Sequence, residues 1–373
     1  MTDKSILIAG AGPVGLTAAL ALHQRGHAVR LIDAKPAGAT QHDPRAIALA
    51  HGSRLILERI GVWNKVTATP IAHIHVSQQG GFGQTRIEAA DYQLDALGYV
   101  ARLGALTQTL RQAALDAGIV IDSAHELHDS ACAADGVIAT IQSDAGEQQC
   151  TTPLLVVAEG KPPVSAERKD YGQTAIVTEA WSDETHNGRA FERFTAEGPL
   201  ALLPLERGYS VVWCMRADHA RALLALDDDA FRARLTHAAA FAQRSWNRVA
   251  ARAAFPLALV QAAAAVHPRS IALGNAAQTL HPVAGQGLNL GLRDAFELAQ
   301  ALEHGVTDPA LTRFAARRAR DRTATITLTD QTVSLFSNQL VPLRIARGAG
   351  LALFNLLPPL RRAMAWRMMF GVR

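Results

Sequence analysis

The feature that most restricts how this chain can fold is a group of three glycines, Gly10, Gly12 and Gly15, spaced as G-x-G-x-x-G. The apolar residues 5–9 before it predict a buried strand, and the Ala- and Leu-rich residues 14–24 after it predict a helix. In this setting Gly10 permits a tight turn, Gly12 lets a pyrophosphate approach the backbone amides, and Gly15 lets the helix pack closely on the strand. The pattern predicts a dinucleotide-binding fold, the alternative being a tight structural turn.

A second small-residue loop, Gly285-Gln286-Gly287, lies far along the sequence. Residues 270–273 predict a strand before it and residues 288–303 predict a helix after it, with Asn275 and Pro282 in between. The amides of such a loop can approach a flat cofactor at a helix N-terminus, with Pro282 as a rigid wall. Two cofactor-contacting loops so far apart in the sequence imply a ligand that extends across the domain. This favours FAD over NAD. The alternative is a glycine-rich turn between a strand and a helix.

The remaining pattern predicts an α/β fold with a discontinuous Rossmann-like FAD-binding domain, an inserted β-sheet substrate domain and a helical C-terminal part. Strands are expected at residues 29–33, 119–122, 137–142 and 154–158, a helix at 105–117, and β-structure over 171–216. The Ala-rich residues 223–250 are expected to be helical. The expected division is 1–70, 101–170 and 266–330 for FAD binding, 71–100 and 171–265 for the substrate sheet, and 331–373 for the helical part.

Charge and cysteine content exclude several classes of protein. The 373 residues carry 37 basic and 33 acidic side chains, and a formal charge of +4 is too dilute to predict nucleic-acid binding. The three cysteines form no CxxC pair and have no histidine at metal-ligand spacing, so neither a metal site nor a disulfide framework is expected. No secretion signal is visible, because the apolar residues 6–22 contain three glycines and a proline. A reduced, cytoplasmic location fits best.

Over nearly its whole length the sequence resembles the ubiquinone-biosynthesis hydroxylases, a branch of the class A flavoprotein aromatic monooxygenases with the p-hydroxybenzoate hydroxylase fold. The resemblance rests on the first glycine loop and on residues 45–50, 59–63, 91–94, 188–195, 198–204, 209–214 and 274–294. Within this branch the sequence is most similar to the 2-polyprenyl-6-methoxyphenol hydroxylases, because Gly274 is followed by Asn275 where the wider class usually has aspartate.

The resemblance implies an enzyme that uses NAD(P)H and O2 to hydroxylate the aromatic ring of a polyprenylated phenol through a flavin C4a-hydroperoxide. It implies that Asp33 holds the adenosine ribose and that Arg45 reaches over the cofactor near its ribityl and phosphate groups. For Arg45 the alternative is a surface salt bridge. The expected flavin-binding residues are Asn275, Pro282, Gly285, Gln286, Gly287 and Asn289.

Two positions depart from the family pattern. Glu159 precedes Gly160 where the class has an Asp-Gly motif linked to flavin and reduced-nicotinamide binding, and it stays in the expected cofactor-binding set because it keeps the charge. Gly104 stands where many relatives have an arginine near the flavin phosphates. The loop after Gly160 is also shorter than in the family. A non-catalytic flavoprotein or scaffold of a quinone-biosynthesis complex is therefore one alternative function, and a nicotinamide-only dehydrogenase is another.

His281 and Pro282 are the expected catalytic residues, because they adjoin the expected flavin face. His281 can handle a proton near neutral pH, with a structural turn histidine as the alternative.

The last part of the chain has no acidic residue after Asp330. Its arginines are interleaved with leucine, methionine and aromatic residues, and they are Arg344, Arg347, Arg361, Arg362, Arg367 and Arg373. One interpretation is a segment that lies on an anionic surface, such as the inner face of the cytoplasmic membrane. The other is a terminal helix packed on the domain, with its arginines extended into solvent.

Overall fold

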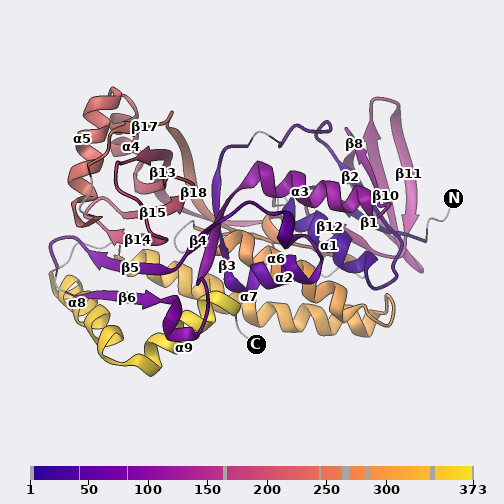
Figure 1. Cartoon of the computed structure of the whole chain (residues 1–373). Helices are drawn as coiled ribbons and strands as arrows, with labels where there is room; N and C mark the ends of the chain where they lie inside the picture. Colours follow the sequence, from indigo (N-terminus) through magenta and orange to yellow (C-terminus); the bar gives the residue numbers. More distant parts are fainter. Residues whose placement is uncertain are drawn as a thin grey trace.

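The computed structural model describes residues 4–41, 43–81, 83–162, 166–242, 245–262, 269–281, 285–336 and 341–371. For residues 332–336 and 341–346 it describes the backbone. The molecule has two halves, one built on a parallel sheet and the other on a larger mixed sheet, and the long helix α7 (Asp308–Phe336) runs beneath both (Figure 1).

The first half is built on five parallel strands in the order β19-β12-β1-β2-β8. These strands are β1 (Ile6–Ala9), β2 (Val29–Asp33), β8 (Val120–Ser123), β12 (Leu155–Val157) and β19 (Ser270–Ala272). All four residues of β1 are buried, as expected for an uninterrupted apolar run at the centre of a sheet that is covered on both faces.

Helices and a small antiparallel sheet cover the two faces of the parallel sheet. Ile6 and Ile8 of β1 share a buried apolar cluster with α1 (Pro13–His23), α3 (Leu103–Asp116) and α6 (Gln286–Ala301). Leu7 and Ala9 point the other way, toward the sheet of β9 (Glu126–Ala133), β10 (Gly136–Ser143) and β11 (Gly146–Thr152). This three-layer arrangement is the predicted Rossmann-like architecture.

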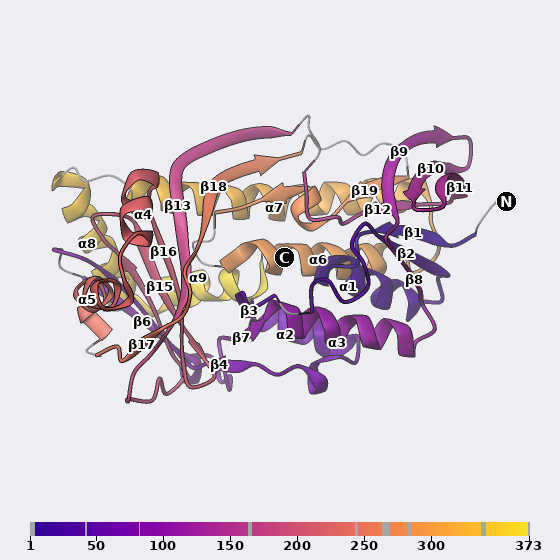
Figure 2. The same ribbon diagram turned by 90° about the horizontal axis from the view of Figure 1, so that it is seen from above.

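The second half is built on a nine-stranded mixed sheet in the order β20-β18-β13-β16-β15-β14-β5-β6, with β17 paired to β13. Its strands are β5 (His73–Gln78), β6 (Gln84–Glu88), β13 (Glu167–Trp181), β14 (Arg189–Phe194), β15 (Pro199–Leu205), β16 (Gly208–Arg216), β17 (Arg248–Val249), β18 (Ala253–Gln261) and β20 (Gln278–Thr279). Helices α4 (Ala217–Leu224) and α5 (Asp228–Ala238) share an apolar cluster with one face of this sheet. The long strands β13 and β18 extend toward the parallel sheet (Figure 2).

Short elements join the two halves. Strands β3 (Ala46–Ala50), β7 (Gly98–Arg102) and β4 (Thr69–Ile71) form a third, antiparallel sheet, and α2 (His51–Arg59) follows β3 directly. The single-turn helices are η1 (Trp63–Lys65), η2 (Ala89–Tyr92), η3 (Ala240–Ala242) and η4 (Gly274–Ala276).

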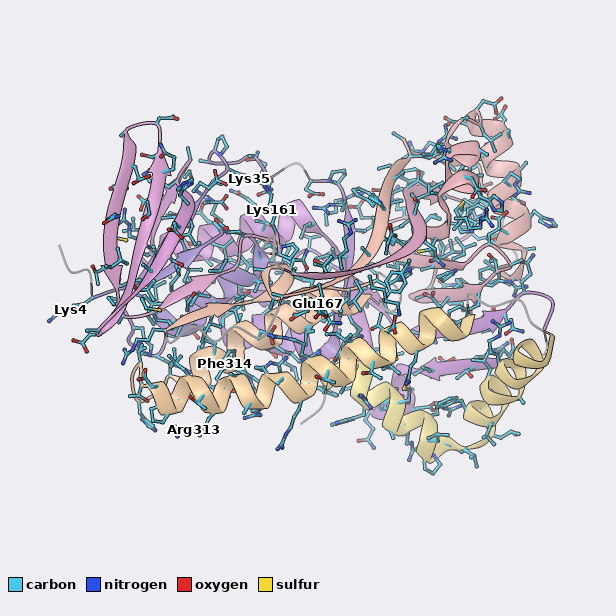
Figure 3. The ribbon with its side chains drawn as sticks, turned by 180° about the vertical axis from the view of Figure 1, so that it is seen from behind. Lys4, Lys35, Lys161, Glu167, Arg313 and Phe314 are labelled. Carbon is cyan, nitrogen blue, oxygen red and sulfur yellow. The ribbon has the colours of Figure 1, made fainter. Side chains whose placement is uncertain are left out.

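Three helices, α7, α8 (Val341–Leu356) and α9 (Pro358–Phe370), form the last part of the structure. Figure 3 shows α7 from behind, with Arg313 and Phe314 on the part beneath the parallel-sheet half. Ala365 and Met369 of α9 are buried in an apolar cluster with Ile87 and Leu97. Among the described residues, we find no helix that is both long enough and apolar enough to cross a bilayer.

A buried group of charges joins α6 to α7. Arg318 is 1% exposed, and its guanidinium donates to Asp294 at 2.5 Å and to Asp321 at 2.7 Å. Arg293 donates to the same Asp321 at 3.1 Å. Burial alone would lower the pKa of Arg318, but the carboxylates of Asp294, Glu297 and Asp321 raise it above its usual range. The two arginines and the three carboxylates therefore compensate one another largely away from water.

The predicted elements before residue 217 are confirmed, whereas the helical structure predicted over residues 223–250 is confirmed only in part. Helix α4 ends at Leu224, and the Asp227 side chain accepts from the Ala230 amide at 2.7 Å to cap a second helix, α5. Residues 248–249 then pair with β13. Alanine content favours helix, but it carries no signal for a cap or for a distant strand partner. Strands β4, β7 and β13 and helix α7 run through residues 70, 100, 170 and 330, so the predicted domain limits at these residues divide continuous elements.

Candidate cofactor and substrate site

The three glycines of the first loop have different surroundings. Gly10 has φ +106°, and a Cβ there would lie 2.4 Å from the Ala158 carbonyl oxygen. A Cβ on Gly15 would lie 1.9 Å from the Gly10 carbonyl oxygen, whereas one on Gly12 would have nothing within 4 Å. Gly10 thus makes the turn and Gly15 the close packing, while Gly12 faces open space at the N-terminus of α1, where a phosphate is favoured.

Asp33 and Glu159 lie at the same edge of the parallel sheet. The Asp33 carboxylate accepts from the Ala11 amide and from the Lys35 amide, both at 2.8 Å, and so braces the glycine loop. Burial raises the pKa of Glu159, with further contributions from Glu126 and Asp33, while a hydrogen bond from the Leu127 backbone opposes the rise. The roles of Asp33 and Glu159 toward a cofactor stay predictions.

Arg45 precedes β3, and its guanidinium pairs with Asp43 at 2.6 Å. The hydrogen bond from Arg45 to Asp43 is the largest effect on the pKa of Arg45 and raises it. The arrangement matches the surface salt bridge that the sequence offered as the alternative for this residue. The same segment explains Gly104, since a Cβ there would lie 2.5 Å from the Gln41 carbonyl oxygen, which leaves no room for an arginine.

The second glycine loop lies at the start of α6. Like the first loop, it has open space in front of one of its glycines. Gly285 is the N-cap with φ +59°, and a Cβ on Gly287 would have nothing within 4 Å. Gln286 is buried and donates to the Met368 carbonyl at 3.4 Å. Asn275 is exposed in η4. Pro282 lies outside the described residues.

Asn289 holds this loop against β3. Its amide oxygen accepts from the Ala50 amide at 2.8 Å and from the Ser53 hydroxyl at 2.7 Å. Its amide nitrogen donates to the carbonyls of Ala48 at 2.9 Å and Gly285 at 2.6 Å. These four contacts use both N–H donors and both lone pairs of the asparagine side chain. The Asn289 side chain therefore positions the loop, and the cofactor-binding role of this residue stays a prediction.

His281 is 1% exposed and lies at the junction of the two halves. Its Nε2 lies 3.2 Å from Gln173 Oε1, and its ring meets the Tyr171 ring edge-on at 5.2 Å between centroids. Burial lowers the pKa of His281 to about 4, so the ring is neutral at pH 7. This favours the structural alternative for His281 over proton transfer near neutral pH.

A cavity of about 390 Å³ lies beside the second loop, between the two halves. Its walls come from β3, β5, β14, β15, the first turn of α6 and helix α9. The lining is mainly apolar, with Leu49, Ile74 and Met369 from three separate elements. The sequence did not predict the α9 wall or the carboxylate of Glu192 in the lining, because both depend on contacts between segments far apart in the chain.

Comparison with known proteins adds independent information. The family profile described as "FAD binding domain" matches residues 3–327. The chain is 34% identical to a ubiquinone hydroxylase, UbiL, of Rhodospirillum rubrum, over 96% of this chain and 87% of that protein. It is 30% identical to the 3-demethoxyubiquinol 3-hydroxylase of Escherichia coli, over 94% of this chain and 95% of that protein.

Solved structures share the fold at low sequence identity. The p-nitrophenol 4-monooxygenase PnpA of Pseudomonas putida superposes with a TM-score of 0.81 at 17% identity, covering 100% of this chain and 99% of that one. A single-residue variant of Klebsiella pneumoniae HpxO, complexed with FAD, superposes with a TM-score of 0.77 at 18% identity, covering 99% of each chain.

Proposed function

Because the chain belongs to the FAD-binding family that contains the ubiquinone-biosynthesis hydroxylases, we propose that it hydroxylates the ring of a polyprenylated phenol, with O2 as oxidant and NAD(P)H as electron donor. The observation that carries this proposal is the position of the apolar cavity, which directly adjoins the glycine loop at the N-terminus of α6. A hydrophobic ring placed there would lie against the face of a cofactor held by that loop.

The residues present fit FAD. Gly12 and Gly287 leave open space in front of two helix N-termini, where backbone amides and the helix dipoles favour phosphate and polar groups. The loop at Gly12 would hold the pyrophosphate, with Gly10 and Gly15 shaping that loop, and Gly285 to Gly287 would adjoin the ring system. When bound and reduced, this cofactor activates O2 and supplies the oxygen atom that enters the substrate.

The remaining lining would bind the substrate and exclude water. Apolar residues of β5, β15 and α9 surround the ring, and the neutral His281 adds no charge. Excluding water protects a reactive oxygen species from side reactions and holds the two reactants in one geometry. The chain thus provides binding and orientation, and the cofactor provides the oxidation.

The test is turnover by the purified protein with a short-chain prenylated phenol, O2 and either NADH or NADPH. We expect bound flavin, and a product heavier by one oxygen atom for each reduced nicotinamide consumed. Bound flavin with no product would favour the scaffold alternative. Nicotinamide-dependent turnover without flavin would favour a dehydrogenase.

We further propose that the enzyme binds its hydrophobic substrate at a membrane surface, which it contacts through the corner, that is, the turn between α8 and α9. This corner exposes four leucines: Leu353 at 49%, Leu356 at 73%, Leu357 at 44% and Leu360 at 43%. Arg362 is exposed beside them, while Arg361 pairs with Asp91 at 3.1 Å. Leucines flanked by a cation suit the interface of an anionic bilayer. The corner leads into α9, whose Ala365, Met368 and Met369 line the cavity.

The double variant Leu356→Asn, Leu360→Asn is expected to weaken binding to vesicles that contain anionic lipid. Each buried leucine contributes about 1.5–3 kcal/mol, so the affinity should fall about tenfold or more. Co-sedimentation with the vesicles measures this affinity. The matched control is Leu115→Asn on α3, which is 47% exposed but far from this corner. Equal vesicle binding by all three proteins would contradict the proposal.

A further inference from the structure

One carboxyl group lies in the cavity wall among apolar side chains. Glu192 lies in the middle of β14, in register with Val76 of β5 on one side and Ala201 of β15 on the other. Ala201 is in turn in register with Val212 of β16. All four residues line the cavity, so the carboxyl group lies in a row of small and branched apolar side chains.

Within the described part of the chain, the Glu192 carboxylate has no hydrogen bond and no ion pair. The nearby arginine of the same strand is used elsewhere: Arg193 donates to Ser77 at 3.2 Å and lies 4.8 Å over the Phe241 ring. Protein surrounds the Glu192 side chain, and the part of its surface that stays accessible faces the cavity. Burial raises the pKa of Glu192 to about 7.

An unpaired carboxylate in an apolar wall opposes folding, and glutamate is almost never found there without a partner. Such a group is therefore a candidate for the binding of a polar atom that enters the cavity with a ligand. The polar atom of a prenylated phenol is its hydroxyl group. Apolar walls with one acceptor are complementary to this ligand.

We propose that Glu192 binds the phenolic hydroxyl of the substrate and accepts its proton, an inference that rests on the function proposed above. The carboxylate accepts the O–H proton as the ring carbon forms its bond to oxygen, because the hydroxyl becomes strongly acidic as the ring loses electron density. As the new C–O bond forms, the O–O bond of the oxidant breaks. The ring carbon then releases its hydrogen as a proton, which the second oxygen atom takes up on its way to water, and Glu192 returns its own proton to the phenolic oxygen as the ring becomes aromatic again. Glu192 ends the cycle ionised, as it began.

This role has a definite pH dependence. The carboxylate is the active form, so hydroxylation should rise with pH and level off above the pKa of Glu192, at about 7. Of the described residues that line the cavity, the other titratable one is His281, whose pKa of about 4 lies well below this range. Burial and then the charge of Glu192 raise the pKa of the neighbouring thiol, Cys214, far above neutrality. The rise near pH 7 therefore belongs to Glu192.

The test compares wild type with Glu192→Gln, Glu192→Asp and Glu192→Leu. Glu192→Gln is expected to keep its flavin and to lose about 100-fold or more in kcat, with little change in KM, because an amide still accepts a hydrogen bond but cannot take the proton. The rise near pH 7 should vanish in Glu192→Gln and persist in Glu192→Asp. The control Glu197→Gln alters an acid that pairs with Arg234 outside the cavity and should behave as wild type.

A binding measurement without turnover completes the test. Wild type should bind a prenylated phenol more tightly than its O-methyl ether, and Glu192→Leu, judged by its flavin spectrum to be folded, should lose this preference. If wild type hydroxylates the phenol and Glu192→Gln matches it in kcat and pH profile, the role of Glu192 is wrong and the proposed function stands. If wild type binds flavin but gives no product, both are overturned.

Discussion

Replacing Gly12 with valine is expected to abolish FAD binding while leaving the fold intact. A Cβ at this position would meet no protein atom within 4 Å, and Gly12 has φ −77°, which a valine adopts without strain. The added side chain would instead occupy the space in front of α1 that the pyrophosphate needs. The affinity for FAD should fall about tenfold or more, which corresponds to the loss of at least about 1.4 kcal/mol of phosphate contacts, so that the purified variant retains little flavin.

The measurement is the flavin absorbance of the purified variant, together with its unfolding midpoint. Gly350→Val is the matched control, because a Cβ on Gly350 also meets nothing within 4 Å but lies in α8. Gly15→Val should act differently and destabilise the protein, since its Cβ would overlap the Gly10 carbonyl. A Gly12 variant with full flavin occupancy would show that the loop is a structural turn only.

Replacing Arg318 with methionine is expected to lower the free energy of unfolding by about 3–5 kcal/mol, because it leaves Asp294 buried without its cation. Asp321 would keep Arg293, so Asp294 bears most of the loss. The free energy can be measured by urea unfolding followed by circular dichroism.

The neighbouring residue supplies the control for this measurement. Arg317 is 66% exposed and pairs with Glu297 at 3.3 Å, so Arg317→Met should change the free energy of unfolding by less than about 1 kcal/mol. Similar losses for the two variants would mean that the buried charges add nothing beyond an ordinary surface pair.

Short-range signals allowed much of the cofactor-binding half to be predicted. A glycine needed for a turn or for close packing leaves its mark within a few residues, which is why Gly10, Gly12, Gly15 and Gly287 lie where the spacing placed them. The sequence could not show that Asn289 uses its whole amide on Ala48, Ala50, Ser53 and Gly285. Its partners lie mostly in β3 and α2, more than half the chain away.

The substrate cavity was harder to predict because its walls are assembled from distant segments. In the sequence, Glu192 is one of three charged residues within residues 189–194, and charged residues usually face solvent. Only the pairing of β14 with β5 and β15 places it in an enclosed row of apolar side chains. The α9 wall could not be predicted either. A helix with both arginines and apolar residues can pack on the domain or lie on its surface, and its sequence does not distinguish the two.

The cavity wall formed by α9 has a consequence for synthesis. Another wall, β3, leaves the ribosome early, whereas Met368 and Met369 are among the last described residues to emerge. Until then, the apolar side chains of β3 and β5 that line the cavity have no cover from α9, and exposed apolar surface of this kind promotes aggregation. The nascent chain should therefore need a chaperone until α9 is released, and it should gain a closed binding site only once α9 has left the ribosome.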